Sequence, residues 1–229
     1  MQRVFPRIVP VLLVLSALCV SPALAANNGI TKIDQQIVRN QGGFPFKITE
    51  SGSYKLTSNL VVPANTDGID IQAEDVTLDL NGFTISGPIV CGFSGDNCQP
   101  LPTVSTTGVS ALVLTATVRN GYVRGFSRGV KTFGGLVEQV QVSSNAIDGI
   151  EANDAVIQRS VARSNGGPGI QAFDSVVTDN QARGNHGSGF FMGGGGVFSN
   201  NTIFPNDPTA DLTDTITTTH SSSCGGAPC

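Results

Sequence analysis

The sequence predicts an all-β solenoid, in which short strands are wound into coils and the coils stack on one another. The first observation is a repeat of twenty residues between positions 136 and 203. An asparagine recurs, and four residues later a glycine is followed by an apolar residue: Asn145, Asn165 and Asn185, with Gly149-Ile150, Gly169-Ile170 and Gly189-Phe190. A period near twenty without an amphipathic helical run is typical of a solenoid with one coil per repeat.

Two apolar columns follow the same period and are the second observation. One contains Val137, Ile157, Val177 and Val197, and the other contains Val142, Ala162, Ala182 and Thr202. The third observation is that apolar and polar residues alternate in short segments such as 156–158, 161–163 and 169–172. This alternation places one face of each strand in the core and the other in water. A single coil cannot bury its apolar side chains, so the coils must stack.

The bends between the strands are rich in Asn and Gly, which tolerate the left-handed backbone of a sharp turn. An asparagine at the same bend of successive coils lies about 4.8 Å from its counterpart. We therefore expect Asn145, Asn165 and Asn185 to form a structural ladder of hydrogen bonds along the stack. Leucine-rich horseshoes have a similar period, but their leucine framework and their helix in each repeat are absent here.

These three coils, together with Val-Thr-Leu-Asp-Leu-Asn-Gly-Phe-Thr-Ile-Ser-Gly at 76–87, resemble the secreted right-handed parallel β-helix repeat family. That broad group includes pectate-lyase-like proteins, and the resemblance covers roughly Gly52 to Ile203. It implies a right-handed parallel β-helix, and the spacing of the repeats gives six or seven coils between Gly68 and Ile203. It says little about function, because the family holds lyases, hydrolases, epimerases, adhesins and proteins without known activity.

The chain is expected to form one domain behind a signal peptide. Residues 1–25 combine Arg3 and Arg7, a short apolar centre and the small-x-small site Ala23-Leu24-Ala25. Leu18 before Cys19 is too large for lipoprotein processing. We expect an exported monomer, periplasmic or extracellular, without a membrane span.

The mature chain divides into three segments. Residues 26–67 are expected to be an N-terminal cap, because a solenoid exposes a raw hydrophobic end and an unpaired strand edge. Residues 68–203 form the β-helix, with an inserted loop at 88–107 that projects from the stack. Residues 204–229 form a C-terminal cap and tail. The resemblance implies that loops such as 88–107 carry functional sites.

The charge and the aromatic content limit the partners. The chain has 13 basic and 17 acidic residues. Loss of Arg3 and Arg7 with the signal leaves 11 against 17, a net charge of −6, which argues against nucleic acid. Because the chain has no Trp and only two Tyr, any glycan-binding surface is expected to rely on polar side chains.

Four cysteines remain after removal of the signal. Cys91 and Cys98 form one close pair, and Cys224 and Cys229 form another. An exported protein meets an oxidising compartment, so these pairs are expected to be disulfides. A bond between the insertion and the tail is the alternative. No Cys-x-x-Cys arrangement with nearby His indicates zinc.

Two motifs invite comparison with polygalacturonases. Asn65-Thr66-Asp67-Gly68 and Gly184-Asn185-His186-Gly187 resemble an Asn-Thr-Asp motif and a Gly-His-Gly motif of that family. About 120 residues separate them here. Five to six coils lie between them, so they are more than roughly 20 Å apart. Carboxylates that flank a glycosidic bond need to lie within about 10 Å. No Asp-Asp dipeptide is present, and His186 is expected to be a surface side chain.

A weak calcium site near Asp154 and Asp174 is one interpretation of these residues, because they share a column and Asp148 is near in sequence. The other interpretation is that each aspartate accepts backbone amides at a solvated bend. Calcium apart, no cofactor is expected.

The most suggestive feature for function is an outward face. Because Val142, Ala162 and Ala182 point inward, their neighbours point outward. We call the outward residues the arginine stripe: Tyr122, Arg124, Gln141, Arg163, Gln181 and Arg183. Guanidinium groups bind carboxylates and sulfates, so the stripe suits a uronic-acid or other acidic polysaccharide. The alternative is that these side chains only keep an exposed sheet soluble.

Three classes of function follow from these observations. The first is an exported, non-catalytic polysaccharide-binding or cell-surface module. The second is a polysaccharide-active enzyme, namely a lyase, an epimerase or a hydrolase. The third is a structural or adhesive unit without a small ligand. Product release separates the second class from the others, and glycan binding separates the first from the third.

Overall fold

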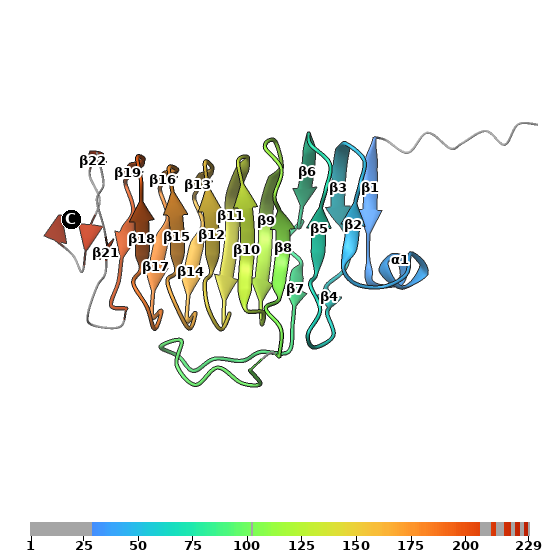
Figure 1. The fold of residues 1–229 in the computed structure, drawn as a ribbon, viewed down its shortest axis with the longest axis horizontal. Helices are drawn as coiled ribbons and strands as arrows, with labels where there is room; N and C mark the ends of the chain where they lie inside the picture. Colours follow the sequence, from blue (N-terminus) through green and yellow to red (C-terminus); the bar gives the residue numbers. More distant parts are fainter. Residues whose placement is uncertain are drawn as a thin grey trace, which may run out of the picture.

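The computed structural model describes residues 29–101 and 103–206, together with short strands between 212 and 228. The chain is a parallel β-helix, in which successive coils add strands to the same two sheets (Figure 1). The predicted fold class is therefore confirmed. The predicted signal segment 1–25, Cys229 and the second disulfide lie outside the described residues.

In the described residues, one sheet has eight strands, one from each coil, and all the neighbours are parallel. In order, its strands are β2 (Phe46–Ile48), β5 (Ile69–Ile71), β8 (Thr107–Ala111), β10 (Arg128–Phe133), β12 (Ile150–Asn153), β15 (Ile170–Phe173), β18 (Phe190–Gly193) and β21 (Leu212–Thr213). Eight strands mean eight coils. The predicted count of six or seven covered only 68–203, and β2 and β21 lie outside that range.

The second sheet, as far as the structure describes the chain, has sixteen strands and bends into two arms. The first arm contains β1 (Ile30–Ile33), β3 (Gly52–Leu56), β6 (Val76–Asp79), β13 (Val156–Gln158), β16 (Val176–Thr178), β19 (Val197–Ser199) and β22 (Thr218–His220). The second arm contains β4 (Leu60–Val61), β7 (Thr84–Ser86), β14 (Val161–Arg163), β17 (Gln181–Arg183), β20 (Thr202–Ile203) and β23 (Ser223–Cys224), with β24 (Ala227–Pro228) antiparallel to β23. Strands β9 (Thr117–Arg124) and β11 (Leu136–Ser143) run through both arms. At the bend, Asn120, Gln139 and Arg159 adopt φ of 59°, 54° and 50°.

The stack begins earlier than expected, inside the segment 26–67 that was predicted to be a cap. Strand β1 pairs with β3, and β3 pairs with β6. The short helix α1 (Gln35–Asn40) lies beside the first coil and buries Val38 (Figure 1). Asp34 caps this helix, because its carboxylate accepts the N–H groups of Gln36 and Ile37 at 2.8 Å. The helix therefore covers the open end of the core, and the rest of the segment supplies coils.

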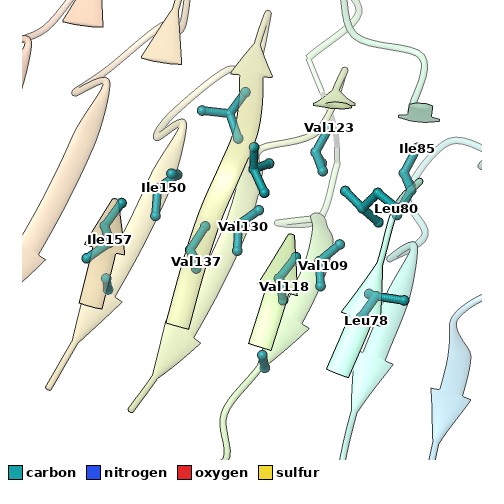
Figure 2. Close-up of a cluster of buried hydrophobic side chains, with 14 of the residues drawn as sticks. Leu78, Leu80, Ile85, Val109, Val118, Val123, Val130, Val137, Ile150 and Ile157 are labelled. Carbon is teal, nitrogen blue, oxygen red and sulfur yellow. The ribbon is translucent and has the colours of Figure 1, made fainter. Parts of the chain in front are cut away.

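The core is a set of inward columns between the sheets. Val109, Val130, Ile150, Ile170 and Phe190 are partners in register along the eight-stranded sheet, and all are fully buried. Figure 2 shows the first three of them among their core neighbours. Because each of these coils places an apolar side chain in this column, every coil covers the core of its neighbours.

The two columns predicted in the other sheet are correct for three coils and wrong for the fourth. Val177 pairs with Phe198, and Ala182 pairs with Ile203. Phe198 is fully buried, whereas Val197 is 38% exposed. The coil that contains Phe198 is longer by one residue than the coil before it. The extra residue lies in the glycine run 193–196, where Gly194 has a φ of 73°. The core columns therefore shift to Phe198 and Ile203.

The asparagines form a ladder inside one bend of the coil. The Asn145 Nδ2 donates to Asn165 Oδ1 at 3.0 Å, and Asn165 Nδ2 donates to Asn185 Oδ1 at 2.9 Å. Asn206, which lies 21 residues after Asn185, accepts the next bond at 2.9 Å. A second, unexpected ladder joins Asn180 Nδ2 to Asn201 Oδ1 at 3.1 Å. These buried amides fix the vertical register of the bends.

Candidate functional site

The arginine stripe lies on the outward face of the second arm. Gln141 is the strand partner of Tyr122, and Arg163 is the partner of Arg183. The structure thus brings all six stripe residues together in two adjacent columns. Each column has one interruption, because Val161 lies between Gln141 and Gln181, and Ser143 lies between Arg124 and Arg163. The arginine side chains are exposed.

The contacts of the stripe leave its positive charge available. With its amide oxygen turned toward the neighbouring rung, Gln141 accepts from Arg163 Nε at 2.9 Å and from Arg163 Nη2 at 2.8 Å. The guanidinium carbon of Arg183 lies 5.7 Å from the centre of the Phe204 ring. Within the described part of the chain, no ion pair to a carboxylate involves Arg124, Arg163 or Arg183. Exposed guanidinium groups are the kind of side chain that pairs with carboxylates and phosphates.

Two hollows adjoin the stripe. One has a volume of about 260 Å³, follows the bend between the two arms, and is lined by residues that include Tyr122, Gln141 and Arg159. The other has a volume of about 320 Å³ and is lined by Phe93, Arg183, Gly184, Phe204 and Pro205. The stripe residues Tyr122 and Gln141 belong to the first hollow, and Arg183 belongs to the second.

The inserted loop lies along the stack instead of projecting from it, which corrects the expectation for 88–107 (Figure 1). The Ser164 Oγ donates to the Phe93 carbonyl at 2.8 Å. A Cβ added to Gly95 would lie 1.9 Å from the Asn165 carbonyl oxygen, so the loop backbone packs directly on the asparagine bends. Small residues at these bends leave room for the loop. Phe93 therefore reaches the coil that carries Arg183.

A disulfide joins Cys91 to Cys98, as expected, and closes a ring that contains Phe93. Replacing both cysteines by serine should lower the free energy of unfolding by about 2 kcal/mol, because a short ring constrains the unfolded chain only modestly. The variant should still fold, since the stacked coils supply the core. Chemical denaturation of parent and variant measures the loss. A non-reduced digest with a peptide joining Cys91 to Cys229 would contradict this pairing.

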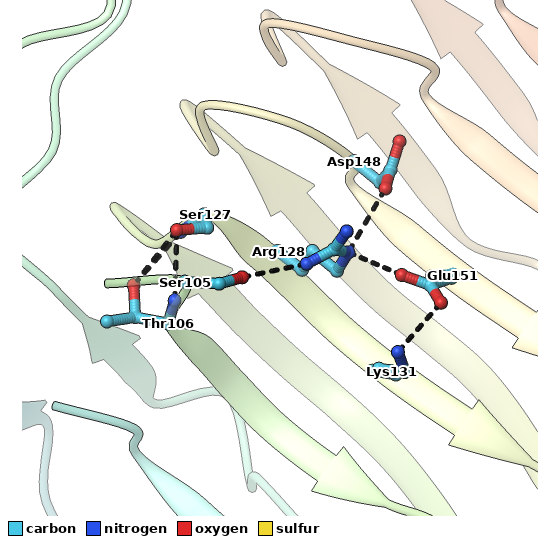
Figure 3. A network of polar contacts seen from close by, with 7 residues as sticks. All are labelled: Ser105, Thr106, Ser127, Arg128, Lys131, Asp148 and Glu151. Atoms are coloured by element: carbon cyan, nitrogen blue, oxygen red, sulfur yellow. Dashed lines mark hydrogen bonds and ion pairs between the residues drawn. The ribbon is translucent and has the colours of Figure 1, made fainter. Parts of the chain in front are cut away.

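A charged cluster lies on the outer side of the eight-stranded sheet, and Asp148 is its buried member (Figure 3). Arg128 Nε lies 3.4 Å from Asp148 Oδ2 and also contacts Glu151. Lys131 Nζ lies 2.9 Å from Glu151 Oε1. Arg128 Nη1 also donates to Ser105 Oγ at 2.8 Å. The sequence carries a signal for this cluster that was missed, because Arg128 and Asp148, like Lys131 and Glu151, are twenty residues apart.

Asp148 is the residue of this cluster whose pKa is shifted. Burial raises the pKa of its carboxyl from 3.8 to about 6, although the Arg128 guanidinium acts in the opposite direction. A pKa near neutrality is typical of a general acid. However, the Asp148 residue is only 3% exposed. A glycosidic oxygen has no access to a carboxyl so enclosed, so we interpret the cluster as a structural network between coils.

Asp148 should make stability depend on pH. A carboxyl whose pKa is raised by folding contributes stability that is fully present below pH 3.8 and lost as the pH rises through 6. Between about pH 3 and pH 7, the stability of the parent relative to Asp148→Asn should therefore fall by about 3 kcal/mol. Urea denaturation of both proteins across this range provides the measurement. A difference that does not change with pH would contradict the displaced pKa.

The aspartates considered for calcium lie at bends. Asp154 and Asp174 adopt φ of 51° and 49°, and the Asp174 carboxylate accepts the Gly195 N–H at 2.7 Å. Among the described residues, no group of three or more His, Cys, Asp or Glu side chains is placed to hold a metal ion. The contact of Asp174 matches the interpretation in which an aspartate accepts a backbone amide at a turn.

The two motifs that resemble those of polygalacturonases stay apart in the fold. The Asp67 carboxylate accepts the Thr107 N–H at 2.7 Å, and five coils separate Asp67 from His186. His186 lines a hollow of about 410 Å³ beside Phe93. No helix in the described residues has both the length and the hydrophobicity to cross a bilayer.

The fold and the stripe define a parallel β-helix protein with a cationic outer face. No family model matches the chain, and no curated protein matches it. Among solved structures, it is similar to the Dettilon tailspike protein (gp208), with a TM-score of 0.49 and 16% identity over 69% of this chain and 41% of that one. It is also similar to the Agl-KA catalytic domain, with a TM-score of 0.37 and 13% identity over 82% of this chain and 49% of that one. The chain thus spans less than half of each.

Proposed function

We propose that this chain is an exported, non-catalytic β-helix module that binds an acidic polysaccharide along the arginine stripe. We further propose that it belongs to the secreted right-handed, pectate-lyase-like group. The observation that carries the proposal is that Arg163 and Arg183 stand exposed on adjacent rungs without a carboxylate partner among the described residues. Rungs lie about 4.8 Å apart, so the two charges repel until an anion lies between them.

The surface suits an extended polymer better than a compact ligand. Parallel strands held by inter-coil hydrogen bonds make the stripe rigid, so little conformational entropy is lost when a polymer binds. Gln141 holds the Arg163 guanidinium by two contacts, which orients its fork before a ligand arrives. Carboxylates of a uronic-acid chain are the groups that such forks recognise in a bidentate manner.

The stripe lacks the groups for cleavage. Its six residues include no carboxylate, and the nearby Glu138 is paired with Arg159 and accepts from Gln158 at 3.0 Å. Glycoside hydrolysis needs two carboxyl groups that flank one bond. Binding without turnover is therefore the activity that this face supports.

The experiment is a binding titration of the purified protein with polygalacturonate, with neutral dextran as the control. Binding to polygalacturonate should weaken as salt rises, because salt screens exposed charges beyond about 10 Å at 0.1 M ionic strength. Repeating the titration with and without calcium tests the aspartate site. The release of unsaturated or reducing products would mean that the protein is a polysaccharide-active enzyme and that this proposal is wrong. Failure to bind any acidic glycan on an array would favour a structural unit.

A further inference from the structure

Two phenylalanines flank Arg183 at one end of the stripe. Phe93, from the inserted loop, is 82% exposed, and Phe204, from the end of the coil, is 40% exposed. With Arg183, Gly184 and Pro205 they line the hollow of about 320 Å³, which we call the phenylalanine hollow. These two aromatic rings contrast with the polar side chains on which a glycan-binding surface was expected to rely.

The phenylalanine hollow continues into a more polar space. The adjoining hollow of about 410 Å³ shares Phe93, Gly184 and Pro205, and it adds the polar residues Ser94, Asp96, His186 and Asn206. Small-ligand sites characteristically combine apolar walls with a few polar groups and have volumes of about 300 to 1,000 Å³. Both hollows fall in this range.

Three features hold the phenylalanine hollow open. The Cys91–Cys98 disulfide and the Ser164 hydrogen bond fix the loop on which Phe93 stands. Ser144 and Ser164 occupy the same bend position as Gly184 in earlier coils, with φ of 52° for each serine and 59° for the glycine. At Gly184 the side chain is absent, and a Cβ there would lie 3.1 Å from the Phe93 carbonyl. The hollow therefore occurs at the coil whose bend residue has no side chain.

We propose that the phenylalanine hollow is a subsite for one pyranose ring of the acidic polysaccharide, an inference that rests on the function proposed above. The apolar face of the ring packs against Phe93, and the ring carboxylate pairs with Arg183, which lies over the Phe204 ring. An aromatic surface beside a guanidinium group selects a ligand that is both cyclic and anionic. The stripe supplies attraction to any polyanion, and the hollow supplies selectivity for sugar rings.

The test is Phe93→Ala, assayed with two polyanions by isothermal titration. Affinity for polygalacturonate should fall roughly tenfold, because one aromatic contact is removed. Affinity for polyglutamate, which has charge but no sugar ring, should not change. Val104→Ala, a truncation of another exposed side chain of the same loop (52% exposed), should leave both affinities unchanged. Phe93→Tyr should retain the parent affinity for polygalacturonate.

The outcomes separate the two proposals. If the parent protein does not bind polygalacturonate, the proposed function is wrong. If the parent binds and Phe93→Ala binds equally well, only the subsite is wrong. If Phe93→Ala lowers the affinity for both polyanions to the same degree, Phe93 only positions the loop, and the subsite is also wrong. Melting curves should be unchanged for Phe93→Ala, because the ring is 82% exposed.

Discussion

Replacing Arg163 and Arg183 together by glutamine is expected to abolish binding of acidic polysaccharide and to leave the melting temperature unchanged. Both side chains are exposed on the outward face of β14 and β17. The protein carries a formal net charge of −4, so its overall charge repels a polyanion. Attraction must therefore come from local contacts within a screening length of the guanidinium groups, and two of the three stripe arginines supply them side by side.

The control for this variant removes the same charge elsewhere. Lys32 and Lys47 are exposed residues of the first coils, and replacing both by glutamine changes the net charge by the same two units. This control should bind polygalacturonate nearly as well as the parent, with a similar dependence on salt. Equal losses in both double variants would mean that net charge alone governs binding. If the arginine variant bound as well as the parent, the stripe would have no role in binding and would only keep the sheet soluble.

Replacing Ile170 by alanine is expected to cost roughly 2 to 5 kcal/mol of unfolding free energy. Ile170 is fully buried, and its strand partners in the coils on either side are Ile150 and Phe190. The variant loses the transfer free energy that burial of the removed atoms contributes to folding. The removed atoms also leave a cavity that neighbouring coils, tied by hydrogen bonds, cannot close. Urea denaturation followed by circular dichroism measures the cost.

Gln171 provides the matched control for this second variant. It is the next residue of the same strand and is only partly buried on the outward side. Gln171→Ala should change stability by less than about 0.5 kcal/mol. If Ile170→Ala melted like the parent, the assignment of inward and outward faces in this strand would be wrong.

The coils could be predicted from the sequence because in a solenoid the spacing along the chain equals the spacing between neighbours in space. Asn145 and Asn165 are twenty residues apart and also hydrogen-bonded. The same rule applies to Lys131 and Glu151, which are twenty residues apart and form an ion pair. The shift from Val197 to Phe198 was harder to predict. Both residues are apolar, and only the turn geometry of the glycine run shows which one faces inward.

The position of the inserted loop could not be predicted from the sequence. The contact between Ser164 and Phe93 joins residues 71 positions apart, and no period relates them. A loop without a repeat carries no information about which coil it reaches. Phe93 could be recognised only as an apolar residue of an insertion, and its proximity to Arg183 and Phe204 is a property of the folded chain.

The two asparagine ladders also have an electrostatic consequence. Along each ladder the amide oxygen faces the preceding coil and accepts from its asparagine, from Asn145 to Asn165, Asn185 and Asn206, and likewise from Asn180 to Asn201. The second N–H of Asn180, Asn185 and Asn201 donates to a backbone carbonyl of the preceding coil. The amide dipoles therefore point the same way and polarise one another, as in a helix macrodipole. Backbone dipoles of a sheet largely cancel, so this alignment is not lost among them. The nitrogen ends of these amides face the C-terminal coils, where Arg183 stands, so we expect their dipoles to favour an anion at that end.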